Sequence, residues 1–340
     1  MIDFRYHIVS LISVFLALAV GIVLGAGPLR DYIADELTGQ VDQLRAEKDA
    51  LRADLDTAEL QLDHQSSYNT EVAPQLLDGT LAARTVAIVE LPGADQDVVT
   101  ALINRLEQSG AAVTARVAVT QTWSDPGQRP FRSGIAGNLL AYLNPAPADD
   151  AGVEATLGAA LGQALTLRDV TDTGVRSADA AAMYELLLSS ELISEVTAPT
   201  RPAYATVVIA PRTPGEDADV TDLNVSYIDL AEALAGTGEG SVLVGTDTAA
   251  NDLVAAVRGD ETAAGVVSTV DGVNTVIGQV TTPLALAAAI GGTVGHYGFA
   301  EGASAVLPAP TALPAPTPAA FAPLSEEEAA QADAEAAAQG

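Results

Sequence analysis

Cysteine is absent from the 340-residue sequence, which excludes disulfide bonds, a thiolate nucleophile and any metal site built on cysteine. Lysine occurs once, at Lys48, so the rest of the chain has no P-loop lysine, no Schiff-base lysine and no Ser-x-x-Lys dyad. A Gly-x-Ser-x-Gly nucleophile elbow is missing too. Methionine is limited to Met1 and Met183, so the sulfur ligands that select soft metal ions are scarce.

Basic residues are also few: 15 Lys and Arg stand against 45 Asp and Glu, which gives a formal net charge of −30. A surface this acidic repels nucleic acids and anionic lipid headgroups, so we exclude nucleic acid as a partner. Aromatic residues make up only 4% of the chain, whereas hydrophobic residues make up 49%. This composition predicts a folded core of small aliphatic side chains.

One long apolar run is present near the amino terminus. Residues 8–29 carry no charge and would rise about 33 Å as a helix, against a hydrocarbon layer of about 30 Å. A signal peptide has a shorter apolar region, and here Pro28 would follow the cleavage-like triplet Gly-Ala-Gly. We expect residues 1–29 to be an uncleaved transmembrane anchor, with a cleaved signal as the alternative. Because acidic residues follow at once, we place the bulk of the chain outside the cytoplasmic membrane.

Residues 30–67 show the heptad spacing of a coiled coil. Seven apolar residues and one lysine occupy the seam: Val41, Lys48, Leu55 and Leu62 at position a, with Leu37, Leu44, Leu51 and Ala58 at position d. In a parallel pair of chains, Glu47 at g would meet Arg52 at e of the other chain. The pattern predicts a homo-oligomer formed through this segment. One amphipathic helix lying against its own domain is the alternative.

Strands and helices alternate over residues 81–300. Thr85–Leu91 indicates a buried strand, Asp95 a helix cap and Val113–Val119 a second strand. Later apolar runs lack period-two alternation, which is typical of parallel strands covered on both faces. We therefore predict an α/β fold with a mostly parallel sheet covered by helices and a helical middle at 123–199. The Pro/Ala-rich acidic end, residues 301–340, is expected to be a disordered tail.

Three polar residues follow expected strands, namely Arg212, Asp247 and Asp271. Ligands of open α/β sheets bind at the carboxyl ends of the strands, so these residues are candidates for one cleft. The same residue types are also ordinary helix caps and turn formers, and this second role is the commoner one.

Histidine occurs only at positions 7, 64 and 296, too scattered for a chelating motif. His64, at the end of the expected coil, and His296, near the last expected helix, remain the candidate metal ligands. Several copies of His64 would meet only in an oligomer, and a helix-end or core position is the alternative for His296. We therefore expect no bound cofactor, and a monomer of the soluble portion should not bind copper(I) with the affinity of a dedicated copper carrier.

Four stretches carry a resemblance to a known family: "YHIVSLISVFLALAVGIVLGAGPLRD", "TVAIVELPGA", "VLVGTDTAAN" and "GVVSTVDGVNTVIGQVTTPLALAAAIGGTVGHYG". They resemble the actinobacterial copper transport family known as MctB, from the amino terminus to about Gly298. The resemblance implies a part in copper efflux and copper homeostasis in the cell envelope, with copper as the transported ion. The family is described as pore-forming in the outer membrane, which makes that membrane the alternative location.

Three interpretations stay open: a copper-linked envelope protein, a non-catalytic membrane-anchored scaffold, and an envelope enzyme with a carboxylate-based site. We expect a protein that is not an enzyme, with a membrane, a second copy of the chain and other envelope proteins as its partners. Copper accumulation in a deletion strain would separate the first interpretation from the second. A cleft with convergent polar groups would favour the third.

Overall fold

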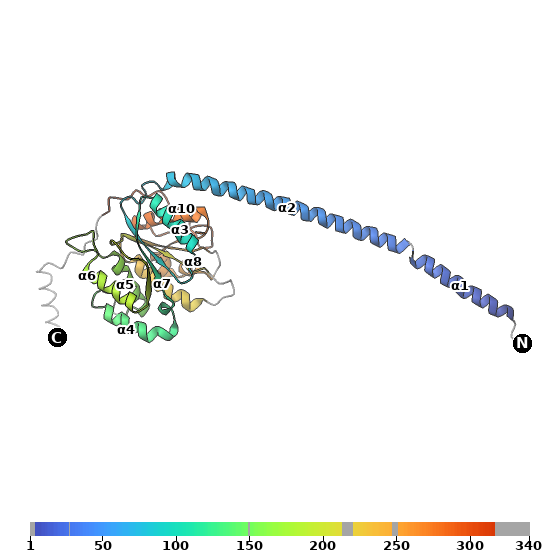
Figure 1. Cartoon of the computed structure of the whole chain (residues 1–340), viewed down its shortest axis with the longest axis horizontal. Helices are drawn as coiled ribbons and strands as arrows, with labels where there is room; N and C mark the ends of the chain where they lie inside the picture. Colours follow the sequence, from blue (N-terminus) through green and yellow to red (C-terminus); the bar gives the residue numbers. More distant parts are fainter. Residues whose placement is uncertain (1–3, 27, 149, 213–219, 247–250, 317–340) are drawn as a thin grey trace. The chain divides into compact units, whose positions relative to one another are not determined.

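The computed structural model of the chain describes residues 4–26, 28–148, 150–212, 220–246 and 251–316 (Figure 1), and the side chains of residues 26–35 fall outside that description. The chain divides into two compact units, residues 1–65 and residues 66–340.

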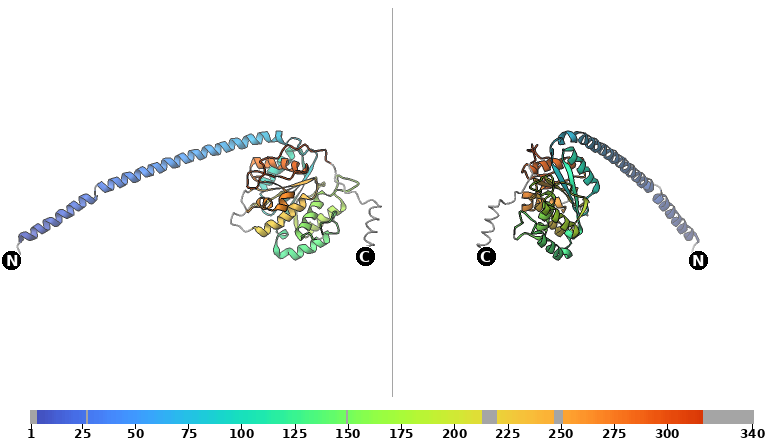
Figure 2. Two further views of the ribbon diagram at one scale, coloured as in Figure 1. Left: turned by 180° about the vertical axis from the view of Figure 1, so that it is seen from behind. Right: turned by 60° about the vertical axis from the view of Figure 1, so that its left-hand side comes forward.

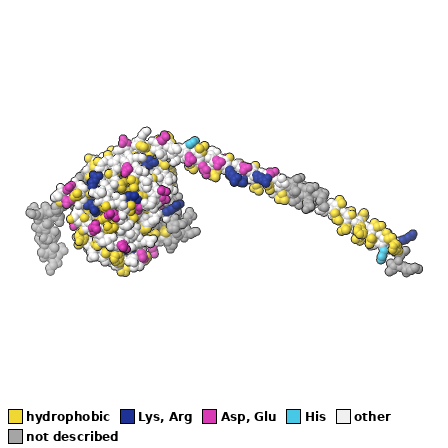
Figure 3. All heavy atoms as spheres, viewed as in Figure 1, with side chains coloured by type: hydrophobic (Ala, Val, Ile, Leu, Met, Phe, Trp, Pro, Cys, Tyr) yellow, Lys and Arg dark blue, Asp and Glu magenta, His cyan; other side chains and the backbone are white. Residues whose placement is uncertain are grey.

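The first unit consists of α1 (Phe4–Ala26) and most of α2 (Pro28–Leu77). Within α1, the stretch Phe4–Gly25 is long and apolar enough to cross a membrane, and none of it is buried by the rest of the chain. It is the one helix of this kind among the described residues. Hydrophobic side chains cover α1, whereas charged and hydrophobic side chains are interspersed along α2 (Figure 3). The expected apolar helix is therefore confirmed.

The second unit contains a seven-stranded sheet with the order β3-β2-β1-β4-β5-β6-β7. The strands are β1 (Thr85–Glu90), β2 (Ala112–Val119), β3 (Ile193–Thr197), β4 (Ala205–Ile209), β5 (Gly240–Val244), β6 (Ser268–Val270) and β7 (His296–Tyr297). β3 pairs antiparallel with β2, and all other pairs are parallel. The predicted α/β fold with a mostly parallel sheet is confirmed. The antiparallel edge strand β3 lies inside the segment predicted to be helical.

Helices cover both faces of this sheet (Figures 1 and 2). They are α3 (Gln96–Gln108), α4 (Arg129–Leu139), α5 (Val153–Thr166), α6 (Ala178–Ser189), α7 (Thr221–Ala235), α8 (Leu253–Gly259), α9 (Glu261–Val266) and α10 (Val276–Ile290). Asp95 caps α3 as predicted, because its carboxylate accepts the backbone N–H groups of Asp97 and Val98.

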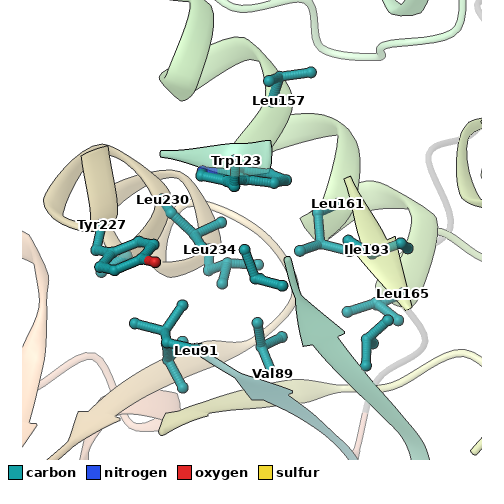
Figure 4. Close-up of a cluster of buried hydrophobic side chains, with 14 of the residues drawn as sticks. Val89, Leu91, Trp123, Leu157, Leu161, Leu165, Ile193, Tyr227, Leu230 and Leu234 are labelled. Carbon is teal, nitrogen blue, oxygen red and sulfur yellow. The ribbon is translucent and has the colours of Figure 1, made fainter. Parts of the chain in front are cut away.

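Two hydrophobic clusters lie on opposite faces of the sheet because successive strand side chains point in opposite directions. Val89 of β1 joins the cluster that contains Trp123, Leu161 and Leu230 (Figure 4). Its neighbour Ile88 joins the second cluster, which contains residues of α3 and α10. Burial on both faces explains why the strands have continuous apolar sequences rather than alternating ones.

The folded domain extends past residue 300, where the sequence led us to expect the tail to begin. Leu313 packs against the second hydrophobic cluster, and Arg84 donates from Nη2 to the carbonyl oxygen of Pro314 at 3.0 Å. Composition alone does not show this attachment, because it depends on an apolar site and a buried guanidinium supplied by distant parts of the chain. Residues 317–340, the remainder of the expected tail, lie outside the described residues.

Candidate functional site

The carboxyl edge of the sheet is where the sequence placed its cleft candidates. Arg212 follows β4 and is exposed, and Asp271 follows β6 and is buried. Asp247, which follows β5, lies outside the described residues. β4 and β6 are separated by β5, so the strands leading to Arg212 and Asp271 lie about 10 Å apart. Asp271 instead bonds Arg258, Phe299 and Ala300, and within the described residues no hydrogen bond or ion pair links it to Arg212.

The order of the strands reverses between β1 and β4, the kind of position at which open α/β sheets bind ligands. The two loops that leave these strands touch there, since the Arg212 N–H donates to the carbonyl oxygen of Gly93 at 3.3 Å. This contact fixes the backbone of Arg212 while its side chain stays exposed.

Asp271 is fully engaged within the fold. Its Oδ2 pairs with Nη1 of Arg258 at 2.8 Å, and both side chains are almost completely buried. The carboxylate also accepts the backbone N–H groups of Phe299 at 2.8 Å and Ala300 at 3.1 Å. A Cβ at Gly298, whose φ is +129°, would overlap this carboxylate, so glycine is needed there. These contacts make Asp271 a structural residue that holds the chain leaving β7.

Arg258, on α8, makes several hydrogen bonds to the chain around Asp271. Its Nε donates to the hydroxyl oxygen of Thr269 at 2.9 Å, and its Nη2 donates to the carbonyl oxygen of Tyr297 at 2.9 Å. Nη1 also reaches the carbonyl oxygen of Glu301 at 3.3 Å. Sequence inspection had drawn attention to Asp271 but missed Arg258, because an arginine in the last turn of a helix normally indicates only a favourable dipole interaction.

His296 lies on β7 rather than at a helix end. Its Nδ1 lies 2.9 Å from the hydroxyl oxygen of Thr269, and its Nε2 lies 3.2 Å from the carbonyl oxygen of Ala264. A carbonyl oxygen only accepts, so the hydrogen-bond network assigns the proton to Nε2. Burial and the nearby Arg258 charge lower the pKa of His296, while the bond to Ala264 raises it. Both ring nitrogens are therefore used by the fold, and metal binding would have to break one of these bonds.

His64 is exposed on α2. It lies two residues after Leu62, so it occupies heptad position c, which points away from the seam of a coiled coil. Self-association through the seam would not bring copies of His64 face to face. Within the described part of the chain, no three His, Asp or Glu side chains are grouped so that they could hold a metal ion.

A second polar cluster at the carboxyl edge was missed by sequence inspection. Glu90, the last residue of β1, is buried and accepts Nε and Nη2 of Arg116 at 3.0 and 2.7 Å. Gln96 completes the cluster by donating to the other carboxylate oxygen at 2.8 Å. The only signal in the sequence was an acidic residue at the end of an apolar strand. The Glu90 carboxylate neutralises the charge of the Arg116 guanidinium, so this cluster, like that of Asp271, stabilises the fold.

A cavity of about 300 Å³ lies at the opposite, amino edge of the sheet. Its lining is uncharged and includes Pro145, Gln163, Thr166, Thr237 and Gly238. Gln163 already accepts the Asn144 N–H and donates to the Pro145 carbonyl oxygen. The cavity therefore offers space and a neutral surface, without the charged groups of acid–base chemistry or cation binding.

Comparison with known families shows which family has this sequence and architecture. The family model described as "Copper transport outer membrane protein, MctB" matches residues 1–308, which include both helices of the first unit and all seven strands. The chain belongs to the MctB family. The resemblance noted in the sequence is thereby confirmed.

Individual MctB relatives match over most of their length. The protein named copper transporter MctB in Mycobacterium tuberculosis is 33% identical over 314 residues, covering 90% of this chain and 99% of the relative. The copper transporter MctB of Mycobacterium leprae is 29% identical over 319 residues, with the same coverage. Together with the family match over residues 1–308, the similarity extends over α1, α2 and the α/β domain.

Proposed function

We propose that this chain takes part in copper homeostasis of the cell envelope as a membrane-anchored, non-catalytic protein. The observation that carries the proposal is the MctB family match over residues 1–308. The apolar helix α1 supports membrane attachment. Copper is the cargo in this proposal, and the α/β domain stands outside the cytoplasm.

The copper role we propose is indirect or depends on assembly. Copper(I) is held best by thiolate and thioether ligands, and the sequence contains no cysteine and only two methionines. His296 is hydrogen-bonded at both ring nitrogens, and His64 points away from the expected seam. These features favour a chain that positions or supports a transport assembly over one that carries copper tightly by itself.

Self-association through the seam of α2 is part of the proposal. Leu44, Leu51 and Leu62 are 63%, 69% and 65% exposed, although each falls at an a or d position. Fully burying a leucine side chain is worth about 1.5–3 kcal/mol before the entropy cost of association is subtracted, so the seam favours a second copy. Anchors in one membrane hold the chains parallel, and Glu47 then meets Arg52 of the other chain.

The test is copper content in a host strain that lacks the gene. We expect this strain to accumulate copper and the full chain to restore the normal level. A double variant, Leu44→Asp with Leu51→Asp, should reach the membrane but fail to restore the normal copper level, because two carboxylates then lie in the seam. The matched control is Ala46→Asp with Ala53→Asp, which adds the same charge at f positions on the opposite face.

The outcomes separate the parts of the proposal. Normal copper content in the deletion strain would refute the copper role and favour the scaffold interpretation, for which the exposed seam is the supporting observation. Full restoration by the Leu44→Asp, Leu51→Asp variant would refute the requirement for self-association and leave the copper role standing.

A further inference from the structure

Residues 298–316 form a strap that runs from the end of β7 to the amino edge of the sheet. At its start, Phe299 and Ala300 donate their N–H groups to Asp271, and Gly298 donates to the carbonyl oxygen of Ala305. At its far end, Leu313 enters the second hydrophobic cluster. Four prolines, at 308, 310, 314 and 316, lack the N–H that a strand needs. The strap is therefore held at a few points rather than by a continuous ladder.

The Arg258–Asp271 pair controls the first of these points. Arg258 bonds the Asp271 carboxylate and the carbonyl oxygens of Tyr297 and Glu301. The two side chains are 3% and 1% exposed, so their attraction is screened little by water. Asp271 in turn holds two N–H groups of the strap. Any change that moves Arg258 loosens both the pair and the strap.

His296 is connected to Arg258 through one hydroxyl group. The Thr269 oxygen accepts from Nε of Arg258, and its proton goes to Nδ1 of His296. A proton added at Nδ1 would leave two cations facing a single hydroxyl oxygen that can no longer donate to the ring. The network as it stands requires a neutral imidazole.

The groups around the ring offer little compensation for a positive charge. Arg258 of α8 is the charged group that acts on the ring. Asp271, the nearest acid of the network, is already committed to Arg258 and the strap. From α9, the Ala264 carbonyl oxygen meets Nε2 of the ring, and Ser304 of the strap bonds the His296 backbone rather than its ring.

We infer that this network is an acid-sensitive latch: protonation of His296 displaces Arg258 from Asp271 and releases residues 298–305, the start of the strap, from the domain. Release frees the N–H groups of Phe299 and Ala300, while Leu313 and the bond from Arg84 to Pro314 still hold the far end. The latch operates inside the domain and does not depend on copper.

The direction of the pH dependence follows from the pKa of His296, which burial and Arg258 lower below its unfolded value of about 6.5. A group whose folded-state pKa is lowered contributes stability above the unfolded pKa. That stability is lost as the pH falls through the folded value. The start of the strap is therefore closed at neutral pH and opens in mild acid.

Hydrogen exchange of the full chain in detergent micelles tests the latch. Exchange is followed from about pH 7.5 to about pH 5, across the ordinary titration range of histidine, and corrected for its intrinsic pH dependence. We expect peptides covering 298–305 to exchange at least about tenfold faster at the acid end. Peptides covering β1 and β4 should stay protected, which shows that the domain remains folded.

Two variants assign the effect to His296. His296→Gln supplies a donor for Ala264 and an acceptor for Thr269, the hydrogen-bonding types of the neutral ring, in a group that does not titrate; its strap should stay protected throughout. Unchanged protection in the wild type, or loss in His296→Gln at the same pH, would overturn the inference. If His296→Gln does not fold, Thr269→Val decides: it removes the hydroxyl that connects the His296 ring to Arg258, so exchange of the strap should lose its acid-dependent rise, and a rise like that of the wild type at an unmoved midpoint refutes the latch.

Discussion

Replacing Asp271 with asparagine tests how much the buried Arg258–Asp271 ion pair, at the carboxyl edge of the sheet, stabilises the domain. The substitution keeps the size of the side chain but removes its charge, and it leaves the Arg258 guanidinium buried at 3% exposure without a counter-ion. Removing one partner of a buried pair costs about 3–5 kcal/mol, because the remaining charge is no longer compensated. The asparagine oxygen still accepts one strap N–H, so part of the network survives. We expect Asp271→Asn to lower the free energy of unfolding by about 3–5 kcal/mol.

Trp123 provides the assay. It is the only tryptophan of the chain and is completely buried in the α/β domain, so its fluorescence reports unfolding of that domain in the full chain. Urea titrations in detergent give the change in free energy. The control is Asp78→Asn, which makes the same chemical change on an exposed turn and should alter stability by less than about 0.5 kcal/mol. A loss of less than about 1 kcal/mol for Asp271→Asn would contradict the prediction, because it would mean that water or another acceptor compensates Arg258.

Gly298, Asp229 and the scarcity of soft ligands each give a further measurable expectation. Gly298→Ala should lower the free energy of unfolding by at least about 1–3 kcal/mol, because its backbone conformation is strained for alanine and because its Cβ would overlap Asp271. Urea unfolding followed by Trp123 fluorescence measures this loss. Burial, Glu154 and Asp260 raise the pKa of Asp229, so the folded state loses stability as the pH rises through that pKa. Asp229→Asn should therefore stabilise the domain at neutral pH by less than about 1 kcal/mol, given solvent screening. Equal effects of the substitution at pH about 4 and about 7 would contradict this expectation. Competition of the full chain with a copper(I) chelator should show no stoichiometric tight binding, because soft ligands are scarce; tight binding would contradict an indirect copper role.

Periodicity along the chain was enough to predict the elements whose causes are local. The apolar run of α1, the strands β1 and β2 to within a residue or two at each end, and the Asp95 cap of α3 all depend on neighbours within a few positions. Continuous apolar strands separated by helices likewise predicted a parallel sheet covered on both faces, because only that arrangement buries both sides of a strand. The heptad seam of residues 30–67 has the same local origin, and its partner stays a prediction.

Tertiary structure alone decided what the polar residues do. Asp271 was a cleft candidate in the sequence, and the fold makes it a buried partner of Arg258, which lies 13 positions away. His296 was expected near a helix, and the fold places it on β7, bonded to Thr269 across 27 positions. The physical reason is that an ion pair or hydrogen bond depends on which groups share a dry site after folding. Sequence spacing carries that information only for neighbours on the same element, whereas burial, which makes these pairs strong, is set by the packing of the whole domain.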